Sequence, residues 1–141
     1  MSTLFRLLVP RQLFNEMIAQ AQAELPNECC GLLAGTIGAD GIARIERRFP
    51  LVNALASPTE YESEPRSLFD AERTRRDLGI EFLAVYHSHP TSEPIPSRKD
   101  CERNGMDDVV HLIIGLKEGT PQVGGWWLRG NDYQEARWDI T

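Results

Sequence analysis

The hydrophobic positions of the chain follow two periods, which predict helices in some segments and strands in others. Between Arg11 and Glu24 apolar side chains recur every three or four residues, which predicts an amphipathic helix that ends before Pro26. A second helix is expected from Pro65 to Gly79, because proline suits a first helical turn and glycine suits a C-terminal cap.

The other apolar runs are short and predict strands. In chain order they are Leu4–Val9, Glu28–Ala34, Ile42–Phe49, Ile80–His87, Val109–Leu116, Gln122–Arg129 and Tyr133–Ile140. A proline-rich loop follows the fourth run, and Ser97 is expected to open a short helix after it. Strands therefore outnumber helices, and we expect a mixed sheet with two main helices, α+β or α/β.

Length and composition fit one ordinary domain over residues 1–141, with 41% apolar and 26% charged residues. The longest apolar runs reach about eight residues, far short of the roughly 20 that span a bilayer, and no secretory signal is apparent. The net charge of −6 argues against a nucleic-acid partner. An odd count of three cysteines favours reduced thiols and a cytoplasmic location. Composition leaves the oligomeric state open.

The candidate metal-binding residues lie at and after the end of one predicted strand. His87 and His89 are two residues apart, so both imidazoles lie on one face of the strand and are close enough to share a cation. Asp100 follows on the short helix. Two imidazoles and one carboxylate form a three-ligand set that leaves a zinc ion a fourth position for water, as in catalytic zinc sites.

An open zinc site needs a base that takes up and returns a proton. Glu28 is the leading candidate, since it stands alone at the head of an apolar strand where burial would raise its pKa toward neutrality. Ser97 places a hydroxyl near Asp100 and could stabilise the developing charge on a carbonyl oxygen. Ser97-x-x-Asp100 is equally the pattern of an ordinary helix cap, and the two roles are compatible.

These residues together resemble a known family. His87-Ser88-His89-Pro90, followed by Ser97 and Asp100, resembles the His-x-His-x(7)-Ser-x-x-Asp signature of the JAMM (MPN-plus) metalloprotease family. The segment Pro26–Gly35 resembles the one that carries that family's catalytic glutamate. Asn53 and Tyr61 lie in a stretch that is similar to short bacterial members. The resemblance covers roughly Leu13 to Leu116.

The resemblance implies an α/β fold of the JAMM/MPN, cytidine-deaminase-like type, a mixed sheet flanked by helices. It implies that His87, His89 and Asp100 bind one zinc ion per chain with a bound water, that Glu28 activates this water, and that Ser97 supports the oxyanion. The short chain is similar to the compact prokaryotic group that cleaves an amide or isopeptide at the C-terminus of a ubiquitin-fold or sulfur-carrier protein ending in Gly-Gly, for example releasing cysteine.

Other interpretations remain beside this one. The chain could be a non-catalytic binding module for ubiquitin-fold proteins, although such modules have usually lost one or more ligands. A nucleobase deaminase is disfavoured, because the His-x-Glu and Pro-Cys-x-x-Cys motifs of that class do not occur. The three cysteines lack metal-binding spacing and are expected to pack in the core, as is His111. Of the pair Trp126-Trp127, one ring is expected in the core and the other at its rim or on a partner.

Overall fold

The computed structural model describes residues 4–106 and 108–141. Three helices are present in this part of the chain: α1 (Arg11–Ala23), α2 (Pro65–Leu78) and α3 (Arg98–Glu102). Gly79 ends α2 in the left-handed conformation, with φ 67°, and Glu64 caps its first turn by accepting hydrogen bonds from the Arg66 and Ser67 amides. The two main helices therefore begin and end within one residue of the positions expected from the sequence.

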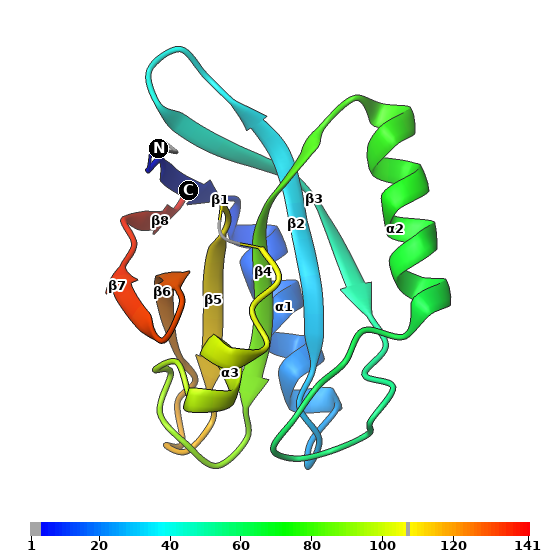
Figure 1. Cartoon of the computed structure of the whole chain (residues 1–141), viewed down its shortest axis with the longest axis vertical. Coiled ribbons are helices and arrows are strands. Elements are labelled where there is room, and N and C mark those ends of the chain that lie inside the picture. Colours follow the sequence, from blue (N-terminus) through cyan, green and yellow to red (C-terminus); the bar gives the residue numbers. More distant parts are fainter. Residues whose placement is uncertain (1–3, 107) are drawn as a thin grey trace.

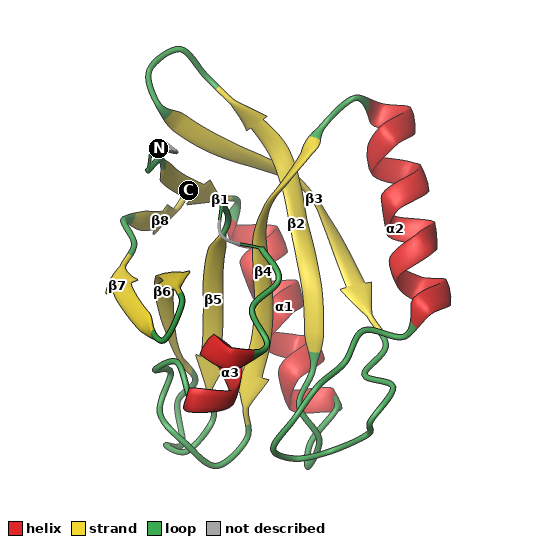
Figure 2. Cartoon of the chain, viewed as in Figure 1, coloured by secondary structure: helices red, strands yellow, loops and turns green. Residues whose placement is uncertain are grey.

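Eight strands form one mixed sheet in the order β7-β6-β5-β4-β2-β3-β1-β8 (Figures 1 and 2). They are β1 (Arg6–Val9), β2 (Cys30–Ile37), β3 (Ile42–Leu51), β4 (Glu81–His89), β5 (Val110–Gly115), β6 (Gln122–Arg129), β7 (Asp132–Glu135) and β8 (Trp138–Ile140). β4 runs parallel to β5, and β1 runs parallel to both β3 and β8, whereas the other neighbours are antiparallel. The expected mixed sheet flanked by helices is confirmed.

The end of the chain differs from the sequence-based expectation of one strand over Tyr133–Ile140. The segment divides into β7, which pairs with β6, and β8, which pairs with β1 at the opposite edge of the sheet. Only Ala136 and Arg137 separate the two strands, so the sheet curls until its edges approach one another. The Ala136 amide donates to Gly125 O and the Leu7 amide to Arg137 O, which directs the chain from one edge to the other.

The two faces of the sheet bury separate apolar clusters. On one face Met17 and Ala21 of α1 pack with Leu33 and Tyr86. On the other face Ala71 of α2 packs with a cluster that includes Leu32, Phe49 and Val85. Figure 2 shows α1 behind the sheet and α2 beside its other face. In the described part of the chain no helix is long and apolar enough to cross a membrane.

The two candidate histidine ligands lie on the central strand β4, next to β2. The expected start of β2 at Glu28 is wrong. Glu28 does not head β2, because the strand begins at Cys30, which lies opposite His87 in the antiparallel ladder. The Cys29 amide instead donates to the Ser88 hydroxyl at 2.8 Å, which ends the regular ladder. Glu28 therefore lies just outside the sheet, near the end of β4.

Candidate metal centre and active site

The imidazoles of His87 and His89 meet at the carboxyl end of β4. The strand period puts both rings on one face, and their Nε2 atoms lie 3.2 Å apart. Both residues are buried, with 1% and 5% of their surface exposed. His89 Nδ1 lies 2.8 Å from the carbonyl oxygen of Glu93, so Nδ1 carries the proton and the Nε2 lone pair points into the site.

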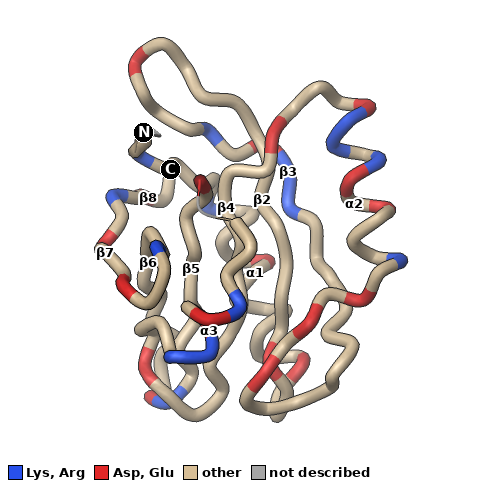
Figure 3. The backbone as a smooth tube through the Cα atoms, viewed as in Figure 1, with Lys and Arg blue, Asp and Glu red and all other residues tan. Residues whose placement is uncertain are grey.

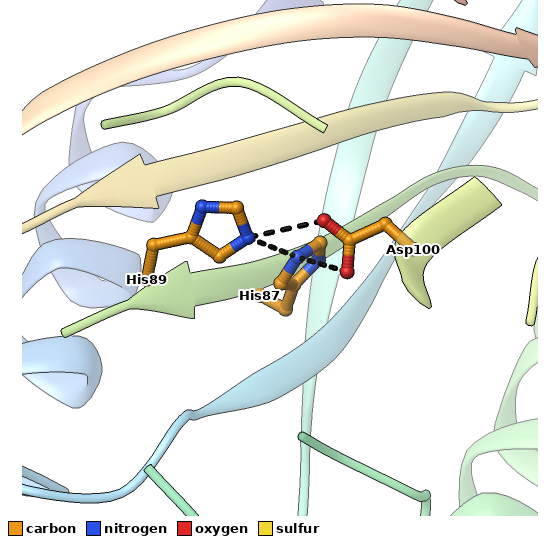
Figure 4. Close-up of side chains that lie close together, drawn as sticks. All are labelled: His87, His89 and Asp100. Carbon is orange, nitrogen blue, oxygen red and sulfur yellow. Dashed lines mark hydrogen bonds and ion pairs between the residues drawn. The ribbon is translucent and has the colours of Figure 1, made fainter. Parts of the chain in front are cut away.

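Asp100 reaches the same point from α3 (Figure 4). Its Oδ1 lies 3.2 Å from His87 Nε2, and its Oδ2 lies 3.1 Å from His89 Nε2. A capping box holds it there: the Ser97 hydroxyl accepts from the Asp100 amide, and the Ser97 amide donates to Asp100 Oδ2 at 2.8 Å. Desolvation alone would raise the pKa of the mostly buried Asp100 carboxyl, but the close contacts with the imidazoles of His87 and His89 lower this pKa well below its usual range.

The donor set fits a divalent metal ion. Ligand atoms of His87, His89 and Asp100 lie within 4.8 Å of one another. With the His89 proton on Nδ1, a lone pair of His89 Nε2 faces a carboxylate oxygen of Asp100 and the second imidazole nitrogen. Lone pairs converge in this way where a cation can lie between them, and two imidazoles with one carboxylate are a set that zinc accepts.

Glu28 adds a carboxyl with unusual acidity to the same region. Its side chain is 4% exposed, and desolvation is the main reason that its pKa rises from 4.5 to about 7. Asp100 and Glu60 also raise this pKa, whereas His89 and Lys99 lower it, which places the carboxyl among these charges. A carboxyl with a pKa near neutrality can both accept and donate a proton at physiological pH.

The raised pKa of Glu28 predicts how stability depends on pH. The folded-state pKa of about 7 exceeds the unfolded value of 4.5, so the folded protein holds the extra proton between these values. This contribution is complete below pH 4.5 and is lost as pH rises through 7. We therefore expect Glu28→Gln to stabilise the metal-free protein by on the order of 2 kcal/mol at pH 8 and much less at pH 5.

Urea unfolding in a chelator at both pH values measures this difference. Glu46→Gln is the control, because Glu46 is exposed on β3 and its replacement should change stability by less than about 0.5 kcal/mol. An equal effect of Glu28→Gln at pH 5 and pH 8 would contradict the burial of a titrating carboxyl.

One cavity of about 750 Å³ extends from Glu28 and part of the candidate metal centre to an apolar surface under α2. Its lining includes Glu28, His87 and Asp100. Apolar side chains from four elements contribute to its lining: Leu32, Leu51, Leu68, Phe82 and Val85. Figure 3 shows acidic positions along the 52–64 segment, which links β3 to α2; Glu60 in it forms an ion pair with Lys99 of α3 at 2.9 Å. The cavity is large enough to receive several residues of an extended peptide.

Sequence reasoning missed two contacts in this region. Tyr61 stacks on the ring of His87, with ring centroids 4.9 Å apart and an angle of 29° between the planes. Ser88, the middle residue of the His-Ser-His motif, is fully buried and binds the Cys29 amide. Spacing in the sequence contains no signal for either contact, because each joins segments that only the fold brings together.

The remaining candidates behave as packing residues. Cys29, Cys30 and Cys101 are buried free thiols, and burial raises the pKa of Cys29 and Cys30 to about 12, as expected for unreactive cysteines. His111 is buried, with Nε2 3.2 Å from Met106 O. Trp127 belongs to the core, and the Trp126 indole is half-buried and donates to Pro94 O at 2.9 Å in the loop after β4.

The chain is similar in sequence to a known protein family and to several of its members. Residues 10–129 match the family model described as prokaryotic homologs of the JAB domain. The chain is 33% identical to the CysO-cysteine peptidase of Mycobacterium tuberculosis over 116 residues, which cover 82% of this chain and 77% of the relative. It is 39% identical to a probable TtuB-protein conjugate cleaving protease of Thermus thermophilus over 110 residues, covering 77% and 70%.

One further relative and one solved structure agree with these sequence matches. A desampylase of Haloferax volcanii is 32% identical over 117 residues, covering 82% of this chain and 79% of the relative. The solution structure of a protein from Desulfitobacterium hafniense superposes with a TM-score of 0.84 at 31% identity, covering 97% of this chain and 93% of that one. The named relatives are peptidases or conjugate-cleaving enzymes, and the architecture is shared over nearly the whole chain.

Proposed function

The chain belongs to the family of prokaryotic homologs of the JAB domain, the compact prokaryotic JAMM/MPN type, and we propose that it is a zinc-dependent peptidase. Its substrate in this proposal is an amide or isopeptide bond at the C-terminus of a ubiquitin-fold or sulfur-carrier protein that ends in Gly-Gly. The observation that carries the proposal is the convergence of two imidazoles and a carboxylate next to a cavity that Glu28, with its near-neutral pKa, lines together with His87 and Asp100. We also propose one domain over residues 1–141 and a cytoplasmic location.

In this proposal His87, His89 and Asp100 hold the zinc ion. Bound there, zinc would act as a Lewis acid toward the scissile carbonyl and toward water. The chain's own contribution is to fix the donors: the Glu93 carbonyl sets the tautomer of His89, and the capping box orients Asp100. These supports lie on α3 and on the proline-rich loop, so the donors need little rearrangement to bind the ion.

Glu28 is the proposed general base and acid. Its carboxylate accepts a proton from the attacking water, and the protonated carboxyl then donates to the nitrogen of the leaving amine. Burial supports this double role, because a pKa of about 7 makes both proton transfers accessible at neutral pH. The names of these relatives support the substrate class, since they describe cleavage of CysO-cysteine and of TtuB-protein conjugates.

Ser97 combines a structural and a proposed catalytic role. Its oxygen accepts the Asp100 amide, and a hydroxyl that accepts one bond still has its own proton to donate. We propose that this proton stabilises the charge that develops on the carbonyl oxygen during attack.

Replacing Ser97 with alanine should therefore lower kcat about 100-fold, in the range found for loss of one oxyanion donor. Loss of the helix cap should lower the free energy of unfolding by about 1 kcal/mol. Steady-state kinetics and urea unfolding measure the two effects. Ser97→Thr keeps both the cap and the hydroxyl, and it should retain most of the activity. If Ser97→Ala retained full activity, only the capping role would stand.

The test of the function as a whole is hydrolysis of a purified carrier-protein conjugate by the zinc-loaded chain. Release of the free carrier C-terminus, detected by mass spectrometry and abolished by chelation, is the expected result. A fully metallated protein that cleaves neither amino-acid nor protein conjugates of any ubiquitin-fold carrier would contradict the proposed substrate class.

A further inference from the structure

One buried amide, Asn53, lies between the proposed base and the segment that leads into α2. Asn53 is 8% exposed and uses every hydrogen-bonding position of its side chain. Nδ2 donates to the carbonyl oxygens of Glu28 at 3.1 Å and of Glu60 at 3.0 Å. Oδ1 accepts from the amides of Leu55 at 3.0 Å and of Glu62 at 3.2 Å. A side chain with four such bonds has one conformation that satisfies it.

These bonds hold a part of the chain that the sheet leaves unsupported. Glu28 lies before β2, so neither of its main-chain polar groups belongs to a strand ladder. Its amide donates to Ser57 O at 2.9 Å, and its carbonyl accepts from Asn53 Nδ2. Both main-chain groups of Glu28 thus bind the 52–64 segment. On its other side, Cys29 is fixed by the Ser88 hydroxyl.

The same segment also contacts the candidate metal ligands. Tyr61, which follows an Asn53-bound residue and precedes another, stacks on His87. Glu60 forms its ion pair with Lys99, the neighbour of Asp100 in α3. Through one amide, the position of the Glu28 main chain is therefore linked to the part of the chain that packs on His87.

We propose that Asn53 is a positioning residue that sets the place of the Glu28 carboxyl relative to His87 and Asp100, without itself touching the substrate. The inference rests on the proposed function, since it assigns Glu28 the role of base. Its physical basis is that a reacting group displaced by about 1 Å can lose on the order of 100-fold in rate. The identity of the side chain matters because only an amide supplies two donors and two acceptors in this plane.

Two variants separate the bonds of Asn53. In Asn53→Asp a carboxylate oxygen replaces Nδ2, so the bonds to the Glu28 and Glu60 carbonyls are lost, while the acceptor for Leu55 and Glu62 remains. Asn53→Ala removes all four bonds. We expect kcat to fall about 30- to 100-fold in both variants. KM should change less than about threefold and zinc content should stay near one per chain, because no proposed ligand is altered.

Amide hydrogen exchange of the metal-free protein, measured by NMR, gives a readout that needs no activity. The Glu28 amide, bonded to Ser57 O, should exchange at least tenfold faster in both variants. The Leu55 and Glu62 amides should exchange faster only in Asn53→Ala. Unchanged exchange at Glu28 in both variants would overturn the proposed link, whether or not the enzyme is active.

Met17→Ala is the control for a general loss of stability. Met17 is fully buried on α1, in the cluster on the opposite face of the sheet. This variant should lower Tm at least as much as Asn53→Ala while kcat stays within about threefold of the wild type. If kcat fell as far in Met17→Ala, or stayed within threefold in both Asn53 variants, the positioning role would be wrong. A wild type that is inactive on all carrier conjugates would instead contradict the proposed function. The exchange data would still show whether Asn53 holds the Glu28 main chain in place.

Discussion

Glu28→Gln should lower kcat for hydrolysis of a carrier-protein conjugate about a thousandfold, within the range for loss of a general acid–base group, while the protein stays folded. Glutamine has nearly the same shape and can keep the neighbouring contacts, but it cannot take a proton from water or return one to the leaving amine. Because the buried carboxyl costs stability at neutral pH, the inactive variant should also be the more stable one. Greater stability combined with lost activity is the signature of a residue kept for function.

The measurement compares kcat, zinc content and urea unfolding in the same preparations. Glu46→Gln serves as the control with the same chemical change at an exposed position of β3, and it should match the wild type in all three. Zinc content should remain near one per chain in Glu28→Gln, since Glu28 is not a proposed ligand. Retention of more than about a tenth of the wild-type kcat would show that another group performs the proton transfers.

Asp100→Asn should have the second large effect, on metal binding. Asparagine preserves the size of the side chain but removes the charge that offsets the cation, leaving two neutral imidazoles. We expect the zinc content to fall from about one per chain to below about 0.1 after dialysis against a weak chelator. Chelation by EDTA should then lower the Tm of the wild type and leave that of Asp100→Asn unchanged, because only a bound ion stabilises the folded state.

The control here is Asp108→Asn, which removes an exposed carboxylate outside the proposed ligand set. Atomic absorption gives the metal content, and thermal unfolding with and without EDTA gives the coupling to stability. Full zinc occupancy in Asp100→Asn would overturn the proposed ligand set. Equal loss in Asp108→Asn would attribute metal binding to the general negative charge of the protein.

Much of the geometry of the candidate metal centre could be predicted because its members lie close together in the sequence. The strand period brings His87 and His89 together, and the Ser-x-x-Asp pattern predicts the capping box that orients Asp100. These are local relationships, in which the geometry of one strand or one helical turn suffices. The boundaries of α1, α2 and β6 followed for the same reason from periodicity, proline and glycine.

The parts that could not be predicted depend on contacts between distant segments. Spacing cannot place Glu28 beside β4. Its lone charge at the start of an apolar run and the family resemblance suggested it as the base, and the structure places it outside β2. The four bonds of Asn53 and the stacking of Tyr61 on His87 follow from the path of the 52–64 segment, which contains no regular period. The division of the last predicted strand into β7 and β8 could not be predicted either, because a two-residue break leaves the alternation of apolar and polar residues almost intact.

The parallel pairing of β1 with β8 also affects how the protein folds. Leu7 lies opposite Trp138, so strands near the two ends of the sequence must meet before this side of the sheet is complete. Closing so long a loop costs entropy that local contacts do not repay, and such topologies fold slowly. During synthesis the edge of β1 stays unpaired until residue 140 has left the ribosome, which gives the nascent chain an exposed strand edge that other chains can bind.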